Sequence, residues 1–329
     1  MNPTGMLVIM GVLGLLPPQG VVAEEYSRLW GRDGEHWTPD GRLPDFSFAG
    51  YHCGEDPLPR VPAVCDVTQF GAVGDGKTDC TASFLEALET TRAGAITIPP
   101  GHYVLSDILW IRKSGVVLRG AGPDKTVIRF QGELEDIRPN MGATTSGRPT
   151  SNYSWSGGFI WARGDLRQKA LTRVTSKASR GSRALTVRHP GGLHAGQWVT
   201  VALEDDDNRT LLDHLYSGDP GNTRELTRAI TPSMVSRIKS VAGNRVVLER
   251  PLRFDLRPAW NPTLKTFDPT VQEIGIEDLS IAFPKKPYAG HFTERGMNGI
   301  AMNGVANGWV RNVRISNCDS GVYLSGIFC

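Results

Sequence analysis

Short apolar segments separated by glycine and proline dominate the pattern of hydrophobic and polar positions along this chain. The first of them are Ala95–Ile98, Tyr103–Leu105, Val116–Leu118 and Val127–Phe130. Apolar runs of this length, bounded by turn residues, are typical of β-strands. The pattern therefore predicts many short strands and turns, and the 38 glycines and 22 prolines of the chain agree with that prediction.

The same pattern returns near the end of the chain, at Ile274–Ile281, Ile300–Met302, Val310–Ile315 and Val322–Leu324. Strands this short cannot bury their apolar faces alone, but stacking them as the rungs of a solenoid does so. Asparagine side chains can hydrogen-bond in the turns between such rungs. The candidates for these turn positions are Asn303, Asn307, Asn312 and Asn317.

One helix is predicted near the start of the solenoid, within the stretch VTQFGAVGDGKTDCTASF. Val67–Val73 alternates weakly as a short strand, and Thr81–Thr91 carries apolar residues at helical spacing. We expect this helix to cover the open end of the strands that follow it.

Two aspartates in this stretch are candidates for either chemistry or local structure. Glycines beside Asp75 permit positive φ, and Thr78 or Asp79 can supply the oxygen that caps the helix N-terminus. We therefore expect Asp75 and Asp79 to serve as turn and cap residues.

The strand pattern changes in the middle of the chain. Leu185–Val187, Trp198–Val201, Val235–Val241 and Arg245–Leu248 read as longer alternating strands, with a hairpin signal at Gly243-Asn244. Residues 169–251 are thus predicted to be an inserted antiparallel β unit. It would interrupt a solenoid that starts in residues 65–168 and resumes in residues 252–329.

The N-terminal residues suggest export from the cell. The apolar run Met6–Leu16 and the small residues before Glu24 predict a signal peptide over residues 1–23, and hence a secreted, extracellular or periplasmic protein. Residues 24–64 are rich in Trp, Gly and Pro and are expected to wrap the domain, with their aromatic side chains packed against it.

The cysteines are odd in number: Cys53, Cys65, Cys80, Cys318 and Cys329. They contain no CxxC pair, so a zinc site is not expected. In an oxidising compartment Cys53 could pair with either Cys65 or Cys80, and spacing does not decide between them.

The net charge is +2 and the basic residues are dispersed along the sequence. Proteins that bind nucleic acid or anionic membranes usually concentrate positive charge. We therefore expect neither partner; the oligomeric state is left open.

Three motifs carry a family resemblance: FGAVGDGKTDCT at Phe70–Thr81, IPPGHY at Ile98–Tyr103 and VLRGAG at Val117–Gly122. Together they resemble the pectate-lyase superfamily, in particular its rhamnogalacturonase and epimerase-like branch. The resemblance implies an all-β, right-handed parallel β-helix with an N-terminal capping helix. It also implies a protein that hydrolyses or β-eliminates a uronate-containing polysaccharide, or a non-catalytic, glycan-binding or structural β-helix such as a tail-spike or adhesin.

Hydrolysis requires two carboxyl groups across the scissile bond. The segment NCDSGVYLSG resembles the family's rung that carries an Asp-Asp pair, but Cys318 stands at the first position and Asp319 at the second. Asp319 is the candidate for acid catalysis. Arg237-Ile-Lys239 has the letters of the family's substrate clamp, but it precedes the candidate acid and is expected to be ordinary strand sequence.

A lyase instead requires a base and positive charge near a uronate carboxylate. Arg311 and Arg314 alternate with apolar residues, so they should project outward and could bind a carboxylate or act as the base. His291, Glu294 and Arg295 lie in the loop KKPYAGHFTERG and are candidates for substrate binding.

No cofactor is expected, although the acidic run Glu204–Asp207 offers oxygen atoms that calcium could use. The sequence stops directly after a predicted rung, without a closing helix. Solenoids usually cover such an end, so we expect the sequence to be a fragment, truncated at its C-terminus.

Overall fold

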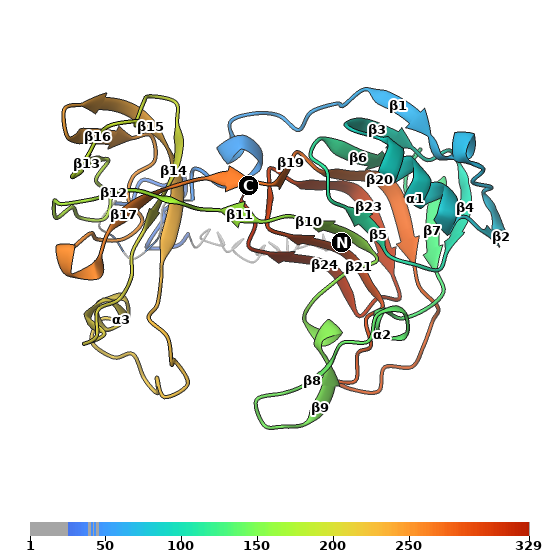
Figure 1. Cartoon of the computed structure of the whole chain (residues 1–329). Helices are drawn as coiled ribbons and strands as arrows, with labels where there is room; N and C mark the ends of the chain where they lie inside the picture. Colours follow the sequence, from blue (N-terminus) through green and yellow to red (C-terminus); the bar gives the residue numbers. More distant parts are fainter. Residues whose placement is uncertain (1–25, 39–40, 42, 44–45, 329) are drawn as a thin grey trace, which may run out of the picture. The chain divides into compact units, whose positions relative to one another are not determined.

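The structure is a computed structural model that describes residues 26–38, 41, 43 and 46–328 (Figure 1). The chain divides into two compact units, Met1–Pro44 and Asp45–Cys329. In the first unit the indole Nε1 of Trp37 donates a hydrogen bond to the carbonyl of Leu43 at 3.0 Å. The predicted signal peptide, residues 1–23, and Cys329 lie outside the described residues.

Parallel strands of the second unit stack into a β-helix with three faces, which confirms the predicted fold class (Figure 1). Two faces belong to one bent eight-stranded sheet, because the first half of β20 pairs with β6 and its second half pairs with β7. We call these faces sheet A and sheet B, and the four-stranded third face sheet C. Sheet A contains β1 (Ala63–Asp66), β3 (Gly94–Thr97), β6 (Val116–Arg119) and the first halves of β20 (Gly275–Ala282) and β23 (Trp309–Ser316). Sheet B contains β2 (Asp75–Asp79), β4 (Gly101–Leu105), β7 (Thr126–Phe130) and the second halves of β20 and β23. Sheet C contains β5 (Leu109–Ile111), β10 (Ile160–Arg163), β21 (Asn298–Asn303) and β24 (Ser320–Ser325).

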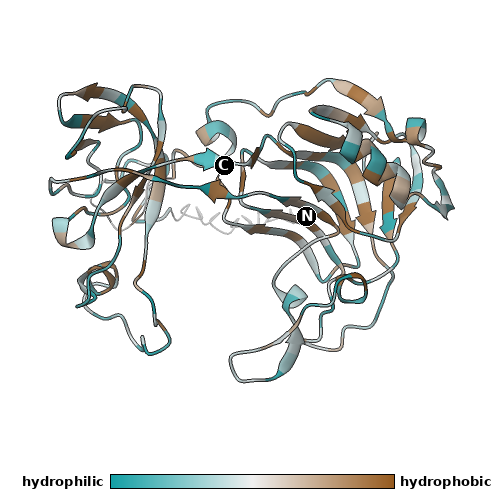
Figure 2. Ribbon diagram, viewed as in Figure 1, coloured by the Kyte–Doolittle hydropathy of each residue, from teal (hydrophilic) through white to brown (hydrophobic). Residues whose placement is uncertain are grey.

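The interior of the β-helix is built from stacked apolar side chains. In sheet C, Leu109, Ile160 and Ile300 occupy matching positions on three successive strands, and all are buried. Each rung buries its apolar face only against the next, as expected for a solenoid. Figure 2 shows hydrophobic residues concentrated along these strands.

Asparagines form the corners between the sheets, as the sequence predicts for three of them. Asn307, Asn312 and Asn317 all have positive φ, between 50° and 57°, which Asn tolerates better than most residues. Each side-chain amide bonds to the rung before it, and the acceptor of Asn312 is Asp278 at 2.8 Å. Asn303 differs, since it lies at a strand end and accepts a bond from Trp161 Nε1.

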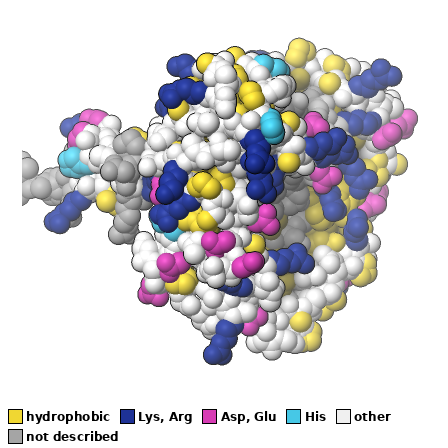
Figure 3. Space-filling model, turned by 60° about the vertical axis from the view of Figure 1, so that its left-hand side comes forward, with side chains coloured by type: hydrophobic (Ala, Val, Ile, Leu, Met, Phe, Trp, Pro, Cys, Tyr) yellow, Lys and Arg dark blue, Asp and Glu magenta, His cyan; other side chains and the backbone are white. Residues whose placement is uncertain are grey.

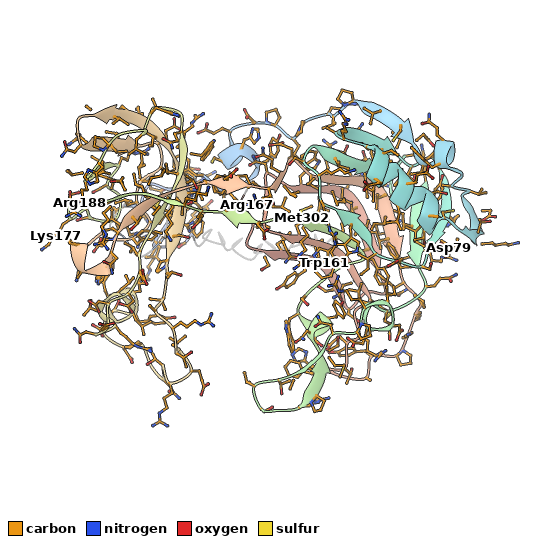
Figure 4. The ribbon with its side chains drawn as sticks, viewed as in Figure 1. Asp79, Trp161, Arg167, Lys177, Arg188 and Met302 are labelled. Carbon is orange, nitrogen blue, oxygen red and sulfur yellow. The ribbon has the colours of Figure 1, made fainter. Side chains whose placement is uncertain are left out.

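The predicted helix is present as α1 (Thr81–Thr90), which buries Phe84 and Leu88 in the core of the β-helix. The N-cap residue is Cys80, and Asp79 just before it accepts hydrogen bonds from the backbone N–H and the hydroxyl of Thr81, at 2.9 and 2.6 Å (Figure 4). Asp79 thus satisfies the first N–H group of the helix, although it is not the N-cap residue itself. The predicted strand at Val67–Val73 is wrong. A 3₁₀ helix, η2 (Val67–Phe70), occupies it, because Asp66 and Gln69 form a capping box there.

Asp75 is a turn residue. Its carboxylate accepts bonds from the N–H groups of Thr78 and Lys77, both at 2.8 Å. These bonds, that of Thr78 first, lower the pKa of Asp75 to about 2.

The outer face of sheet A is covered by the segment that precedes β1. Tyr51, Leu58 and Val61 pack on a buried cluster that includes Trp309. The indole of Trp309 lies over Gly275, where a Cβ atom would come within 2.5 Å of the ring. Residues 51–61 thus pack against the β-helix as expected, and only glycine fits beneath the indole.

The insertion is a closed antiparallel β-barrel. Its six strands follow the order β12-β17-β14-β15-β16-β13. The first and last strands of this order are joined by two backbone hydrogen bonds, from Arg188 N–H to the Arg173 carbonyl at 2.9 Å and from Thr175 N–H to the Thr186 carbonyl at 2.7 Å. A two-stranded stalk, β11 (Leu166–Arg167) with β18 (Asp268–Pro269), joins it to the β-helix. The barrel strands are β12 (Ala170–Arg173), β13 (Ala184–Thr186), β14 (Trp198–Ala202), β15 (Ser233–Ala242), β16 (Arg245–Leu248) and β17 (Thr263–Thr266).

The barrel has its own buried core, and it extends past the boundary predicted at Pro251. Leu252, Trp260 and Leu264 belong to that core, together with Val199 and Ile238. The helical turn α3 (Thr210–Leu215) and η4 (Pro258–Trp260) complete the insertion. The strand alternation stops at Leu248, so the pattern alone did not reveal that β17 returns to the barrel.

The remaining elements are short. They are η1 (Tyr51–Gly54), α2 (Leu134–Ile137), the hairpin of β8 (Met141–Ala143) and β9 (Pro149–Ser151), η3 (Asn152–Ser154), and the parallel pair β19 (Val271–Gln272) and β22 (Val305–Ala306). No helix in the described part of the chain is long and apolar enough to span a membrane. Cys53, Cys65, Cys80 and Cys318 are free thiols.

Candidate functional site

Three of the six predicted site residues line one pocket. Asp319, Glu294 and Arg295 share a cavity of about 390 Å³ with Lys286 and Glu133, which we call the Asp319 pocket. It lies where the chain enters β21 and β24, because Met297 and Asn317 also line it.

Asp319 holds the backbone of this loop in place. Its Oδ2 accepts hydrogen bonds from the N–H groups of Gly296 and Met297, at 3.0 and 2.8 Å. The geometry therefore gives Asp319 an anchoring role, and the predicted role in acid catalysis stays a prediction.

The other two carboxyl groups of the pocket are held as anions. Burial would raise the pKa of Glu133, but hydrogen bonds from Lys286 and Arg295 lower it overall. Burial would likewise raise the pKa of Glu294, but hydrogen bonds from its own backbone N–H, from Tyr288 and from His291 lower it overall. His291 contacts Glu294 at 3.4 Å and does not itself line the pocket. These carboxylates suit ionic contacts better than proton donation.

Arg311 and Arg314 project outward, as predicted, but both are engaged in ion pairs away from this pocket. Arg311 Nη2 and Arg119 Nε each lie 2.5 Å from an oxygen of Glu277, whose side chain is fully buried. Arg314 pairs with Asp124 at 2.7 Å on the exposed surface. We call Arg119, Glu277 and Arg311 the sheet A ion ladder, since they occupy matching positions on three strands.

The acidic run Glu204–Asp207 caps α3. Asp205 accepts bonds from the N–H groups of Leu211 and Leu212, and Asp206 accepts from Thr210. Among the described residues, no group of three or more His, Cys, Asp or Glu side chains is arranged to hold a metal ion.

A larger cavity lies elsewhere, between the barrel, the segment before β1 and a corner of the β-helix. Its volume is about 760 Å³, and we call it the basic cavity. Its lining residues are Phe48, His52, Cys53, Glu55, Asp56, Arg183, Trp198, Arg237, Lys239, Glu249, Arg250 and Asn307. Figure 3 brings the barrel side of the molecule forward and shows many Lys and Arg side chains over that face.

Most of the acids in the basic cavity are neutralised by neighbours. Glu249 pairs with Arg237 at 2.7 Å, and Asp56 lies 2.6 Å from His52 Nδ1. Arg183 and Lys239 are exposed and form no ion pair with the described acids. The cavity therefore presents a net positive lining, which suits an anionic ligand.

His52 is clamped between two carboxylates at the edge of this cavity. Its Nε2 lies 2.8 Å from Glu273 Oε1, and Tyr51 donates to the other oxygen of Glu273 at 2.5 Å. His52 and Cys53 both have positive φ, 47° and 64°, which is uncommon for such residues and costs conformational energy. Contacts from both ring nitrogens to Asp56 and Glu273 hold His52 in place, and strained residues of this kind often lie at binding sites.

We predict a pH-dependent contribution of His52 to stability. Burial alone would lower its pKa, but the bonds to Glu273 and Asp56 raise it overall. Because the folded pKa exceeds the unfolded value of about 6.5, the stabilisation is complete below that pH and is lost as the pH rises through the folded pKa. Urea unfolding of the wild type should show this loss between mildly acidic and mildly alkaline pH, and His52→Gln should reduce it. An unchanged pH profile in the variant would contradict the role of His52.

Sequence reasoning missed the basic cavity. Its lining comes from separate stretches, residues 48–56, the barrel strands and Asn307, which fold together only in three dimensions. The one sequence signal was Arg237-Ile-Lys239. This segment lies on β15, as expected, but Arg237 and Lys239 both line the cavity.

The fold is thus a parallel β-helix with a basic, partly aromatic cavity. Residues 64–172 match the family model described as Rhamnogalacturonase A/epimerase, pectate lyase-like, which confirms the resemblance predicted from the motifs.

Relatives match over a limited part of their length. The chain is 34% identical over 97 residues to mannuronan C5-epimerase AlgE4 of Azotobacter vinelandii, covering 27% of this chain and 18% of the epimerase. It is 35% identical over 65 residues to the probable rhamnogalacturonase C of Aspergillus niger, covering 17% of this chain and 14% of that protein. Among solved structures, the tailspike protein gp49 of Pseudomonas phage LKA1 aligns with a TM-score of 0.46 and 18% identity over 79% of this chain and 40% of the tailspike.

Proposed function

We propose that this protein is secreted and binds an acidic, uronate-containing polysaccharide in the basic cavity, which it cleaves by β-elimination. The observation that carries the proposal is the lining of that cavity. Arg183 and Lys239 offer positive charge without an ion pair to any described acid, and Trp198 offers an aromatic face. Guanidinium and ammonium groups form charge-assisted bonds to carboxylates, so a uronate fits this chemistry.

The related proteins support a polysaccharide ligand. The names of the matched relatives are those of a mannuronan epimerase and a rhamnogalacturonase. The chain spans less than a fifth of either protein, so the reaction itself has to be argued from the residues described here.

β-Elimination fits the electrostatics better than hydrolysis does. A glycosidase needs a carboxyl group whose pKa is raised so that it can donate a proton. In the basic cavity, where we place the reaction, the carboxylates of Asp56 and Glu249 are engaged by His52 and Arg237, whereas Arg183 and Lys239 form no ion pair with a described acid. In β-elimination a base removes the proton α to the uronate carboxylate, the bond from the β carbon to oxygen breaks, and the departing oxygen takes up a proton. Cations such as Arg183 and Lys239 would stabilise the enolate intermediate.

A non-catalytic glycan-binding protein is the second candidate. It is favoured by the role of Asp319, whose carboxylate is occupied by two backbone N–H groups. Binding without cleavage would require only the basic cavity.

Product analysis separates these functions. Polygalacturonate, mannuronate-rich alginate and rhamnogalacturonan are each incubated with the protein, and we expect ultraviolet absorbance from an unsaturated uronate to rise together with reducing ends. Reducing ends without that absorbance would show hydrolysis instead. Binding to a polymer without either signal would establish the non-catalytic function, and no binding to any of the three would refute the proposal.

A further inference from the structure

A second cavity shares Trp198 with the basic cavity. Its volume is about 520 Å³, and we call it the stalk cavity because Arg167 and Asp268 of the stalk line it. The full lining is Arg167, Lys169, Gln197, Trp198, Thr266, Phe267 and Asp268. Arg167 and Lys169 are exposed, and neither forms an ion pair with a described acid. Positive charge thus lies in both cavities.

Trp198 is held in position between neighbouring side chains. Its ring centroid lies 5.5 Å from that of Phe328, nearly edge-on, and 6.3 Å from that of Phe267, while Arg237 lies 5.9 Å from it. The residue is half-buried and sits at the start of β14. A fixed indole offers an apolar face and loses little conformational entropy on binding, so it suits stacking against the C–H face of a sugar ring.

We infer that the two cavities form one extended site for a linear polyuronate, with Trp198 as the stacking platform between them. Arg183 and Lys239 bind carboxylates in the basic cavity, and Arg167 and Lys169 bind them in the stalk cavity. The inference rests on the proposed function, and it adds that the ligand is a chain long enough to reach both cavities. Each volume alone is that of a small-molecule site. Joining two such sites by one ligand raises affinity through effective concentration.

The acids in the lining favour a polysaccharide over a single-stranded nucleic acid. Basic grooves with aromatic residues also bind nucleic acids. Here Glu55 and Glu249 line the basic cavity and Asp268 lines the stalk cavity. Each uronate residue carries hydroxyl groups that can donate hydrogen bonds to these carboxylates, whereas the backbone phosphates of a nucleic acid are acceptors only. A ligand with alternating hydroxyl and carboxylate groups therefore matches the lining.

The test compares affinity with ligand length. Isothermal titration measures the Kd of oligogalacturonates and oligomannuronates, from dimer to octamer, for the wild type and for Arg167→Ala/Lys169→Ala. In the wild type we expect Kd to fall by about tenfold or more between dimer and octamer. In the double variant most of this gain should be lost, and Trp198→Ala should lose it too, while Trp198→Phe keeps part of it.

A matched control is available on the barrel. Lys177 and Arg188 are exposed cations that line neither cavity, and Figure 4 shows both on the barrel away from Arg167 in the stalk. Lys177→Ala/Arg188→Ala removes the same charge and should keep the full length dependence, and circular dichroism confirms that each variant folds. If oligomers bind with the same length dependence in wild type and Arg167→Ala/Lys169→Ala, the extended site is wrong and the proposed function stands. If no oligomer binds the wild type, both fail; tighter binding of oligo(dT) than of the uronate octamer would overturn the choice of ligand.

Discussion

Replacing Glu277 with alanine is expected to lower the free energy of unfolding by about 3–5 kcal/mol, the range for a buried ion pair that loses one partner. Glu277 is fully buried, and its two oxygens bind Arg119 and Arg311 at 2.5 Å and Trp309 Nε1 at 3.2 Å. Its loss would leave two guanidinium groups without this counter-charge on sheet A, where one nitrogen of Arg119 already lacks a hydrogen-bond partner within the described part of the chain. Urea unfolding of the purified protein measures the change.

Asp124→Ala is the matched control for this variant. It also removes one acid from an arginine pair, but the side chains of Arg314 and Asp124 are 60% and 78% exposed. Exposed pairs contribute about 0–1 kcal/mol, so this variant should unfold close to the wild type. Equal destabilisation by the two substitutions would show that burial does not govern the sheet A ion ladder.

Reversing the charge of Arg183 and Lys239 is expected to weaken binding of polygalacturonate by at least about a hundredfold, since each bond to a charged group contributes about 1.5–3 kcal/mol. Both side chains line the basic cavity and neither has a described acid as ion-pair partner. The affinity of the wild type should also fall as salt is added, because exposed charges are screened. Titration of Arg183→Glu/Lys239→Glu with polygalacturonate tests the prediction.

The control reverses the same charge outside the cavity. Lys177→Glu/Arg188→Glu alters two exposed residues of the barrel that line neither cavity. Its affinity should decrease only slightly, through the long-range field. If both double variants lose affinity equally, the net charge of the barrel binds the polymer and the basic cavity has no specific role.

Local patterns in the sequence were sufficient to predict the rungs of the β-helix. Gly94–Thr97 and Val116–Arg119 are strands close to where the apolar runs predict them, because the apolar run and the turn residues that mark each rung lie within one short segment. The corners at Asn312 and Asn317 were predictable for the same reason, since asparagine is suited to positive φ. The error at Val67–Phe70 arose where a local capping box outweighed a weak alternation.

The candidate site was less predictable, because its residues meet only through tertiary structure. The sequence offered Glu294 and Arg295, in one loop, and Asp319, in a later rung, as separate candidates, and the structure brings them to one pocket. It could not reveal that Glu277 forms an ion pair with Arg311, because the two residues become neighbours only through the register of β20 and β23.

By itself, the amino-acid sequence determined the stacked rungs, the capping helix and the presence of an antiparallel insertion, because these depend on periodicity, turns and caps within short segments. Tertiary structure alone decided that the insertion closes as a barrel through residues 173–175 and 186–188, and that Arg183, Trp198 and Lys239 meet His52 at one cavity. The cavity joins His52 to residues more than a hundred positions away, and the barrel closes only when the other four strands have paired in order between β12 and β13. No local pattern in the sequence encodes either arrangement.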